Sequence, residues 1–151
     1  MKVLNGSACK REILERFDRL RPAAPRRWGK MNAAQMVCHL SDSFLGAMGE
    51  RTISPARSIF WRQMRWAALY MPMHWPHGVP TRPEADPFAD GTQPVYFDED
   101  VRSLFAVIER FVRTPRDFEF QPHPMFREMT EAEWMRWGYL HCDHHLRQFG
   151  L

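Results

Sequence analysis

Cysteine is scarce in this 151-residue sequence, and the three thiols form no recognisable pattern. Cys9, Cys38 and Cys142 are an odd set, none lies in a CxxC pair, and a chain of this length does not need disulfides to be stable. Free thiols are typical of a reducing compartment. We therefore expect a cytoplasmic protein.

Long apolar runs are also missing. No stretch approaches the ~20 apolar residues that a membrane-spanning helix needs, and the N-terminus becomes polar before any apolar run develops. Mean hydropathy is −0.51, and 44% of the residues are hydrophobic against 26% charged. This composition is typical of a globular chain. We expect no membrane partner and one domain over residues 1–151.

The chain has a net charge of +3, but it lacks a recognised nucleic-acid motif. Many basic residues have an acidic neighbour one helical turn away: Glu12 with Arg16, Glu15 with Arg19, Glu109 with Arg113. We interpret these as solvated helix faces and expect no nucleic-acid partner. Paired carboxylates, a glycine-rich phosphate loop and a serine-nucleophile motif are also missing, which narrows the catalytic classes by absence only.

What the sequence does contain is helical periodicity. Apolar residues recur at helical spacing in five segments: 7–20, 32–49, 55–70, 98–112 and 130–149. Ser7 is the expected cap of the first segment and Pro55 opens the third. Asn32 with Gln35, and Thr130 with Glu133, have capping-box spacing. No convincing strand pattern is present, so the predicted fold class is all-α.

Six prolines lie between Met71 and Phe97, and no period is sustained there. We expect a long irregular crossover, in which only residues 93–97 could be briefly extended. Four main helices with one more inserted in the crossover suggest a four-helix bundle whose long connection breaks the simple up-down order.

Histidines supply the most informative pattern. His141 and His145 are four residues apart on the last predicted helix. They lie on one face, about 6 Å apart along the axis, so both imidazoles can aim at one point. A third ligand must come from another helix, and His39, near the middle of the second one, is the obvious candidate. Three imidazoles would give Zn²⁺, Ni²⁺ or Fe²⁺ an open, reactive site.

A plainer interpretation stays open, because pairs of this spacing are more often surface pairs or satisfied core histidines. Trp134, Trp137 and Gln148 share the face of His141 and His145, however, and an unpartnered imidazole on an apolar face is costly. We expect Met36, Ser43, Trp137 and Gln148 to line the pocket. His144 could support a ligand, contact substrate or be exposed, and Asp42 could move protons or orient a ligand.

Four stretches resemble the DinB/YfiT-like superfamily of metalloenzymes, and more closely an uncharacterised bacterial branch of it. They are Gly29–Leu40, His123–Phe126, Met129–Trp134 and Tyr139–Phe149. The resemblance implies a DinB-like bundle with a long crossover, and a metal held by one histidine on the second helix and an HxxxH pair on the last. His39, His141 and His145 match that triad. Similar proteins are often homodimers, and several use bacillithiol, mycothiol or glutathione.

The first hypothesis for function is therefore a metal-dependent transferase that activates a low-molecular-weight thiol toward a small-molecule substrate. Metal-assisted hydrolysis, with water as the nucleophile, cannot be separated from it by sequence. A non-catalytic bundle, stabilised by metal or metal-free, that holds an apolar ligand or dimerises is the third alternative. The aromatic run Trp61, Trp66, Tyr70 and Trp75 motivates this third hypothesis. His74 and His77, in the crossover, could cap the site.

Overall fold

A computed structural model of the chain describes residues 1–57 and 60–151. Its four long helices are α1 (Ser7–Arg19), α2 (Ala33–Ala47), α5 (Phe97–Val112) and α6 (Glu131–Gln148). Two short helices, α3 (Phe60–Gln63) and α4 (Arg65–Tyr70), and one 3₁₀ turn, η1 (Pro83–Ala85), lie between α2 and α5. No strand occurs in these residues, and the all-α fold class is confirmed. None of the helices found there is long and apolar enough to cross a membrane.

Both predicted capping boxes are present. The Asn32 side chain accepts from the backbone N–H of Gln35 at 2.9 Å, and the Gln35 side chain accepts from the backbone N–H of Asn32 at 3.0 Å. Thr130 and Glu133 form the same reciprocal pair at the start of α6. The predicted Ser7 cap is wrong: Gly6 occupies the cap position, Ser7 is already helical, and no side chain caps the helix.

The predicted helix over 55–70 is also wrong at its start. Residues 55–57 are not helical, residues 58 and 59 lie outside the described part, and the helical remainder is divided into α3 and α4. Leu69 is the one buried residue of these two short helices. Helices this short gain little without a packed face, so apolar periodicity alone does not extend them. The irregular crossover after Met71 is confirmed, and residues 93–97 form no strand.

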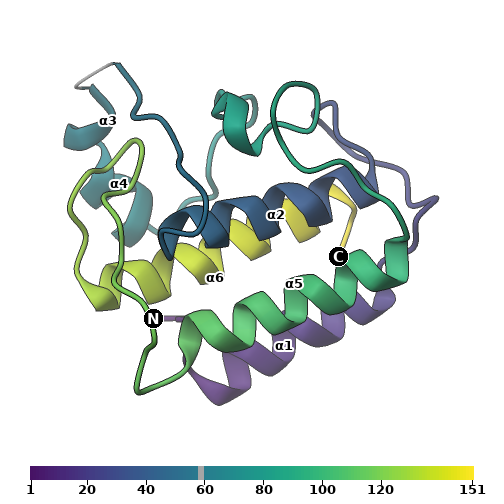
Figure 1. The fold of residues 1–151 in the computed structure, drawn as a ribbon, viewed down its shortest axis with the longest axis horizontal. Coiled ribbons are helices and arrows are strands. Elements are labelled where there is room, and N and C mark those ends of the chain that lie inside the picture. Colours follow the sequence, from purple (N-terminus) through teal and green to yellow (C-terminus); the bar gives the residue numbers. More distant parts are fainter. Residues whose placement is uncertain (58–59) are drawn as a thin grey trace.

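The four long helices share one apolar core. Helix α2 lies against α5 and α6, and α1 packs against α6 (Figure 1). Each contributes a fully buried aromatic ring to the core: Phe17, Phe44, Phe111 and Trp134. The crossover with α3, α4 and η1 lies on the opposite side of α2 and α6 from α1 and α5 (Figure 1). The space between α2, α6 and the crossover is where a site can form.

Gly138 allows α6 to approach the other long helices closely. A Cβ atom at this position would lie 2.9 Å from Leu4 Cδ2, 3.2 Å from Phe44 Cε1 and 3.3 Å from Phe111 Cε1. These three side chains are fully buried, so they have little space to move away.

We expect Gly138→Val to lower the free energy of unfolding by about 1–3 kcal/mol, because it overpacks the core. Urea denaturation measures the change. Ala106→Val adds a β-branched side chain on the exposed face of α5 and should change stability by less than about 0.5 kcal/mol. Equal stability of the two variants would contradict the close packing.

Candidate metal centre

Three histidine side chains converge where α2 faces α6. His39 comes from α2, and His141 and His145 lie one turn apart on α6. Each offers one ring nitrogen, and these atoms all lie within 4.8 Å of one another. The ring of His39 lies 5.2 Å from that of His141 and 4.8 Å from that of His145, between centroids. The sequence prediction that these three residues meet is confirmed.

Hydrogen bonds fix the proton on two of the rings. His39 Nδ1 lies 2.8 Å from the carbonyl oxygen of Ala85, and His145 Nδ1 lies 3.0 Å from Gln148 Oε1. Both partners are oxygen acceptors, so Nδ1 donates in each case and the Nε2 lone pair of the neutral ring stays free. Orienting partners of this kind are typical of metal-binding histidines.

The remaining nitrogens face one another without a satisfactory arrangement of protons. His39 Nε2 lies 3.2 Å from His141 Nε2. His141 Nδ1 is buried and has no hydrogen-bond partner in the described part of the chain. If His141 placed its proton on Nε2 to satisfy His39, the lone pair of His145 Nε2 would still be unused. A cation at this point would accept one lone pair from each of the three rings, so the donor set fits a divalent metal ion.

Burial keeps these imidazoles uncharged. Desolvation lowers the pKa of His39, and it lowers the pKa values of His141 and His145 well below the ordinary value. The neighbouring histidines lower the pKa values of His141 and His145 further, because two positive charges at this separation repel. Neutral imidazole is the form that ligates a metal.

A cavity of about 1190 Å³ opens beside the three histidines. Its wall is mainly apolar and includes tryptophan and methionine side chains, among them Trp28, Trp61, Met64, Met71, Trp75, Met125 and Trp137. Ser43, Trp137 and Gln148 line the cavity, as expected. Met36 does not: it lies on the same side of α2 as His39 and Ser43 but nearer the start of the helix, where its side chain is fully buried among core side chains.

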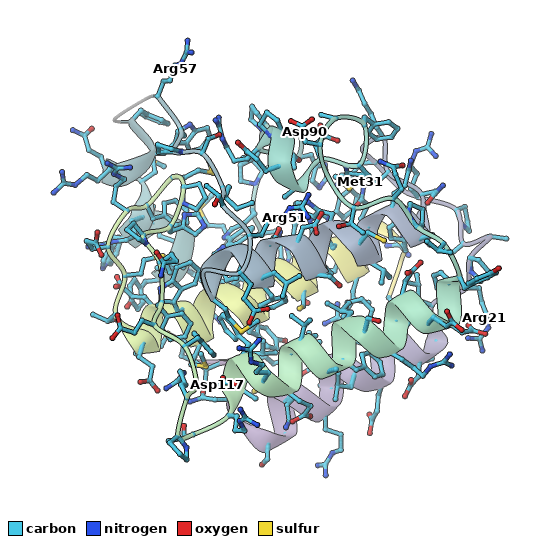
Figure 2. All side chains as sticks on the ribbon, viewed as in Figure 1. Arg21, Met31, Arg51, Arg57, Asp90 and Asp117 are labelled. Atoms are coloured by element: carbon cyan, nitrogen blue, oxygen red, sulfur yellow. The ribbon has the colours of Figure 1, made fainter. Side chains whose placement is uncertain are left out.

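Asp42 is engaged elsewhere. Its carboxylate accepts from the backbone N–H and the hydroxyl of Thr92, each at 2.7 Å, and pairs with Arg51 at 3.0 Å. Arg51 also donates to the carbonyl oxygen of Asp90, and Figure 2 shows Arg51 and Asp90 on the same side of α2. This network fastens the crossover to α2. Its contacts favour a structural role for Asp42 over the catalytic one considered from sequence.

His144 lies on the cavity wall beside the three ligand candidates. Desolvation first, then the nearby His77, lower its pKa to about 4. Its ring lies between those of Trp28 and Trp75, with centroids 5.8 and 6.0 Å away, and its Nδ1 has no partner within the described residues. His77 stacks on Trp28 at 4.0 Å. His74 also lines the cavity. The ring of His144 therefore forms part of the cavity wall, while its Nδ1 atom is enclosed by protein.

Gln148 is itself positioned by a loop that precedes α2. Its Nε2 donates to the carbonyl oxygen of Trp28 at 2.8 Å, which leaves Oε1 facing His145. Gly29 makes this possible: its φ is +78°, and a Cβ there would lie 2.4 Å from Gln148 Nε2. Sequence reasoning placed Gln148 on the pocket wall but missed Trp28, Gly29 and the carbonyl of Ala85. A backbone carbonyl group is common to every residue, so the sequence does not show which one accepts a hydrogen bond. Gly29 was a sequence signal for a close approach of the backbone to another group.

The comparisons with known proteins place the chain within a family and no further. A family model described as "Protein of unknown function (DUF1569)" matches residues 8–150. No curated protein matches the chain, and no solved structure matches it. The resemblance to the DinB/YfiT-like superfamily therefore stays a prediction.

Stability should depend on pH through these buried histidines. Desolvation lowers the pKa of His123 from 6.5 to about 3, and that of His39 also falls. Between the two pKa values of such a group, the unfolded chain binds more protons than the folded one, so stability falls as pH falls. For the metal-free protein we expect a stability plateau above pH ~7. Below pH ~6.5 we expect a loss of about 1.4 kcal/mol per pH unit for each such histidine.

Urea denaturation between pH 7.5 and 5.5 measures this dependence. His123→Asn removes one of the titrating groups. It should therefore reduce the slope of the free energy of unfolding against pH by about 1.4 kcal/mol per pH unit. A flat profile down to pH 5.5 would show that these histidines are not neutral in the folded protein.

Gln148→Leu should weaken divalent-metal binding by about 10- to 100-fold, because His145 loses the acceptor that orients it. Competition with a coloured chelator gives the dissociation constant for zinc. Gln121→Leu makes the same change on the same cavity wall, at a side chain that bonds to no histidine. Its zinc affinity should match that of the unmodified protein. An equal loss of affinity in both variants would contradict the proposal that Gln148 orients His145 for metal binding.

Proposed function

We propose that this chain, which belongs to the DUF1569 family of unknown function, is a metal-dependent enzyme acting on a small molecule in the cavity beside His39, His141 and His145. The observation that carries the proposal is the arrangement of ring protons. His39 and His145 commit their Nδ1 protons to fixed oxygen acceptors, so two Nε2 lone pairs meet a third imidazole at the floor of a cavity.

The site would be open. Three protein nitrogens leave coordination positions for exogenous ligands, and the cavity gives a small molecule access to them. When bound, a Zn²⁺, Ni²⁺ or Fe²⁺ ion would supply Lewis acidity that lowers the pKa of a coordinated nucleophile. The chain's own residues hold the three rings neutral, orient two of them and surround the site with apolar side chains.

The specific reaction that we propose is transfer of a low-molecular-weight thiol to an electrophilic carbon of the substrate: the thiol loses its proton, a carbon–sulfur bond forms, and a leaving group on that carbon departs with the electron pair of the broken bond. A nitrogen-only donor set with open positions suits a thiolate ligand. The cavity of about 1190 Å³ is large enough to hold a small cofactor and a substrate together. The ring of His144 lines the cavity wall and is placed to contact either of them. Hydrolysis at the same centre is the alternative within enzymes.

A non-catalytic alternative has one specific observation in its favour. The crossover helices expose Phe60, Met64, Trp66 and Tyr70, more large apolar side chains than a solvent-facing surface usually gathers. A homodimer that covers this face, with a metal stabilising the bundle, would explain it. Such a metal would raise the thermal stability strongly, whereas an open catalytic metal would leave melting nearly unchanged when it is removed.

The proposal is tested by loading the protein with cobalt and adding thiols. We expect about one equivalent of Co²⁺ per chain and a visible spectrum of low coordination number. Cysteine, glutathione, bacillithiol or mycothiol should add a sulfur-to-cobalt charge-transfer band with at least one of the four, because the open positions can accept a thiolate.

The matched control is a triple variant, His39→Ala with His141→Ala and His145→Ala, analysed for metal content alongside the unmodified protein. It should retain less than a tenth of the metal. Equal content in both proteins would remove the metal site. A cobalt spectrum that none of the thiols changes would remove the thiol reaction and leave hydrolysis as the enzymatic alternative.

A further inference from the structure

His123 lies on the cavity wall, in the loop between α5 and α6, and it belongs to no part of the three-histidine centre. Its side chain is 6% exposed and lines the cavity. Its Nδ1 accepts hydrogen bonds from the backbone N–H groups of Met125 at 3.1 Å and Phe126 at 3.0 Å. Because Nδ1 is the acceptor, the single proton of the neutral ring must be on Nε2.

The ring is held in one orientation. It stacks on Phe126 at 4.5 Å, with 12° between the ring planes, and it contacts the rings of Trp134 and Trp137. The turn that carries it is closed by two backbone hydrogen bonds with Arg127, at 2.8 and 2.9 Å. Desolvation keeps the imidazole neutral by lowering its pKa to about 3. At neutral pH the group is therefore a fixed hydrogen-bond donor and not a proton carrier.

The Nε2–H group of His123 has no hydrogen-bond partner within residues 1–57 and 60–151. The Nε2 atom is not fully enclosed by protein, so it keeps access to the cavity that His123 lines. Buried donors in folded proteins are nearly always paired. A fixed, unpaired donor at the edge of an apolar cavity is consequently placed to meet an acceptor on a bound molecule.

This donor lies close to the proposed metal centre. The indole of Trp137 contacts the ring of His123 at 5.6 Å and the ring of His141 at 4.8 Å. The two imidazoles thus border the same stretch of cavity wall. The wall around them is mainly apolar, and Met125 and Trp134 belong to it.

We propose that the Nε2–H of His123 donates a hydrogen bond to an oxygen atom of the substrate, and that the substrate is an apolar molecule carrying a carbonyl or similar acceptor oxygen. This inference rests on the proposed function in that it names the substrate class of the same site. The donor itself needs no metal. A test on metal-free protein therefore separates its failure from a failure of the metal proposal.

The test uses two probes of similar size, acetophenone and ethylbenzene, in which a carbonyl group replaces a methylene group. The full-length, chelator-treated protein is titrated with each, and dissociation constants are measured by tryptophan fluorescence. In ¹H–¹⁵N spectra of labelled histidines, acetophenone should shift the Nε2–H signal of His123 and ethylbenzene should not. Absence of that shift at saturating acetophenone would overturn the proposal.

Two variants separate the donor from the structural role of Nδ1. His123→Asn places an amide oxygen near the position of Nδ1, so the turn keeps its acceptor while the distal donor is lost. His123→Gln carries an amide nitrogen near the position of Nε2, so the distal donor is kept. We expect the preference for acetophenone over ethylbenzene, taken as a ratio of dissociation constants, to fall about 3- to 10-fold in His123→Asn.

His123→Gln should retain most of that preference, even where its folding stability is lower. An unchanged ratio in His123→Asn, or an equal loss in both variants, would show that His123 only supports the turn. That result would overturn the proposal and would leave the metal-binding prediction untouched.

Discussion

The hydrogen bond from His39 Nδ1 to the carbonyl oxygen of Ala85 joins the two parts of this structure. His39 belongs to the packed long helices, whereas Ala85 belongs to the crossover. The bond satisfies one nitrogen of a buried imidazole and decides which nitrogen of that imidazole is left for a ligand. Without it, the tautomer of His39 would not be defined, and the cluster would lose one of its two oriented rings.

The other attachments of the loops follow the same pattern. Thr92 and Arg51 hold the crossover to the carboxylate of Asp42, while Trp28 holds Gln148. Each joins a residue of a long helix to a segment without regular structure. The apolar core fixes α2 and α6, and these polar contacts then place the cavity walls against them. Burying a carboxylate without a partner costs free energy. The crossover is therefore stabilised in the one position that pairs Asp42.

Local signals in the sequence were enough to predict the helices that carry the site. The capping boxes at Asn32 and Thr130 are reciprocal hydrogen bonds between residues three apart, and no distant contact can easily override them. The i,i+4 spacing of His141 and His145 fixes their common direction once α6 forms. The predicted helix from residue 55 was wrong at its start, because apolar periodicity does not show whether a helical face has enough surface to pack against. The tautomer of His123 could not be predicted from the sequence either. It depends on a turn in which the backbone N–H groups of Met125 and Phe126 donate to the imidazole ring.

Neither α1 nor α5 contributes a residue to the cavity, although both supply fully buried side chains to the core. Within the described chain, the walls come from α2, α6, the loop that precedes α2, and the loops and short helices between α2 and α6. Selection on stability and selection on ligand choice therefore act on largely separate sets of positions. A lineage could exchange the aromatic and methionine side chains of the crossover, and so change what the cavity admits, while its apolar core and its three histidines stayed as they are. Such an arrangement favours evolutionary divergence of specificity on a conserved helical frame.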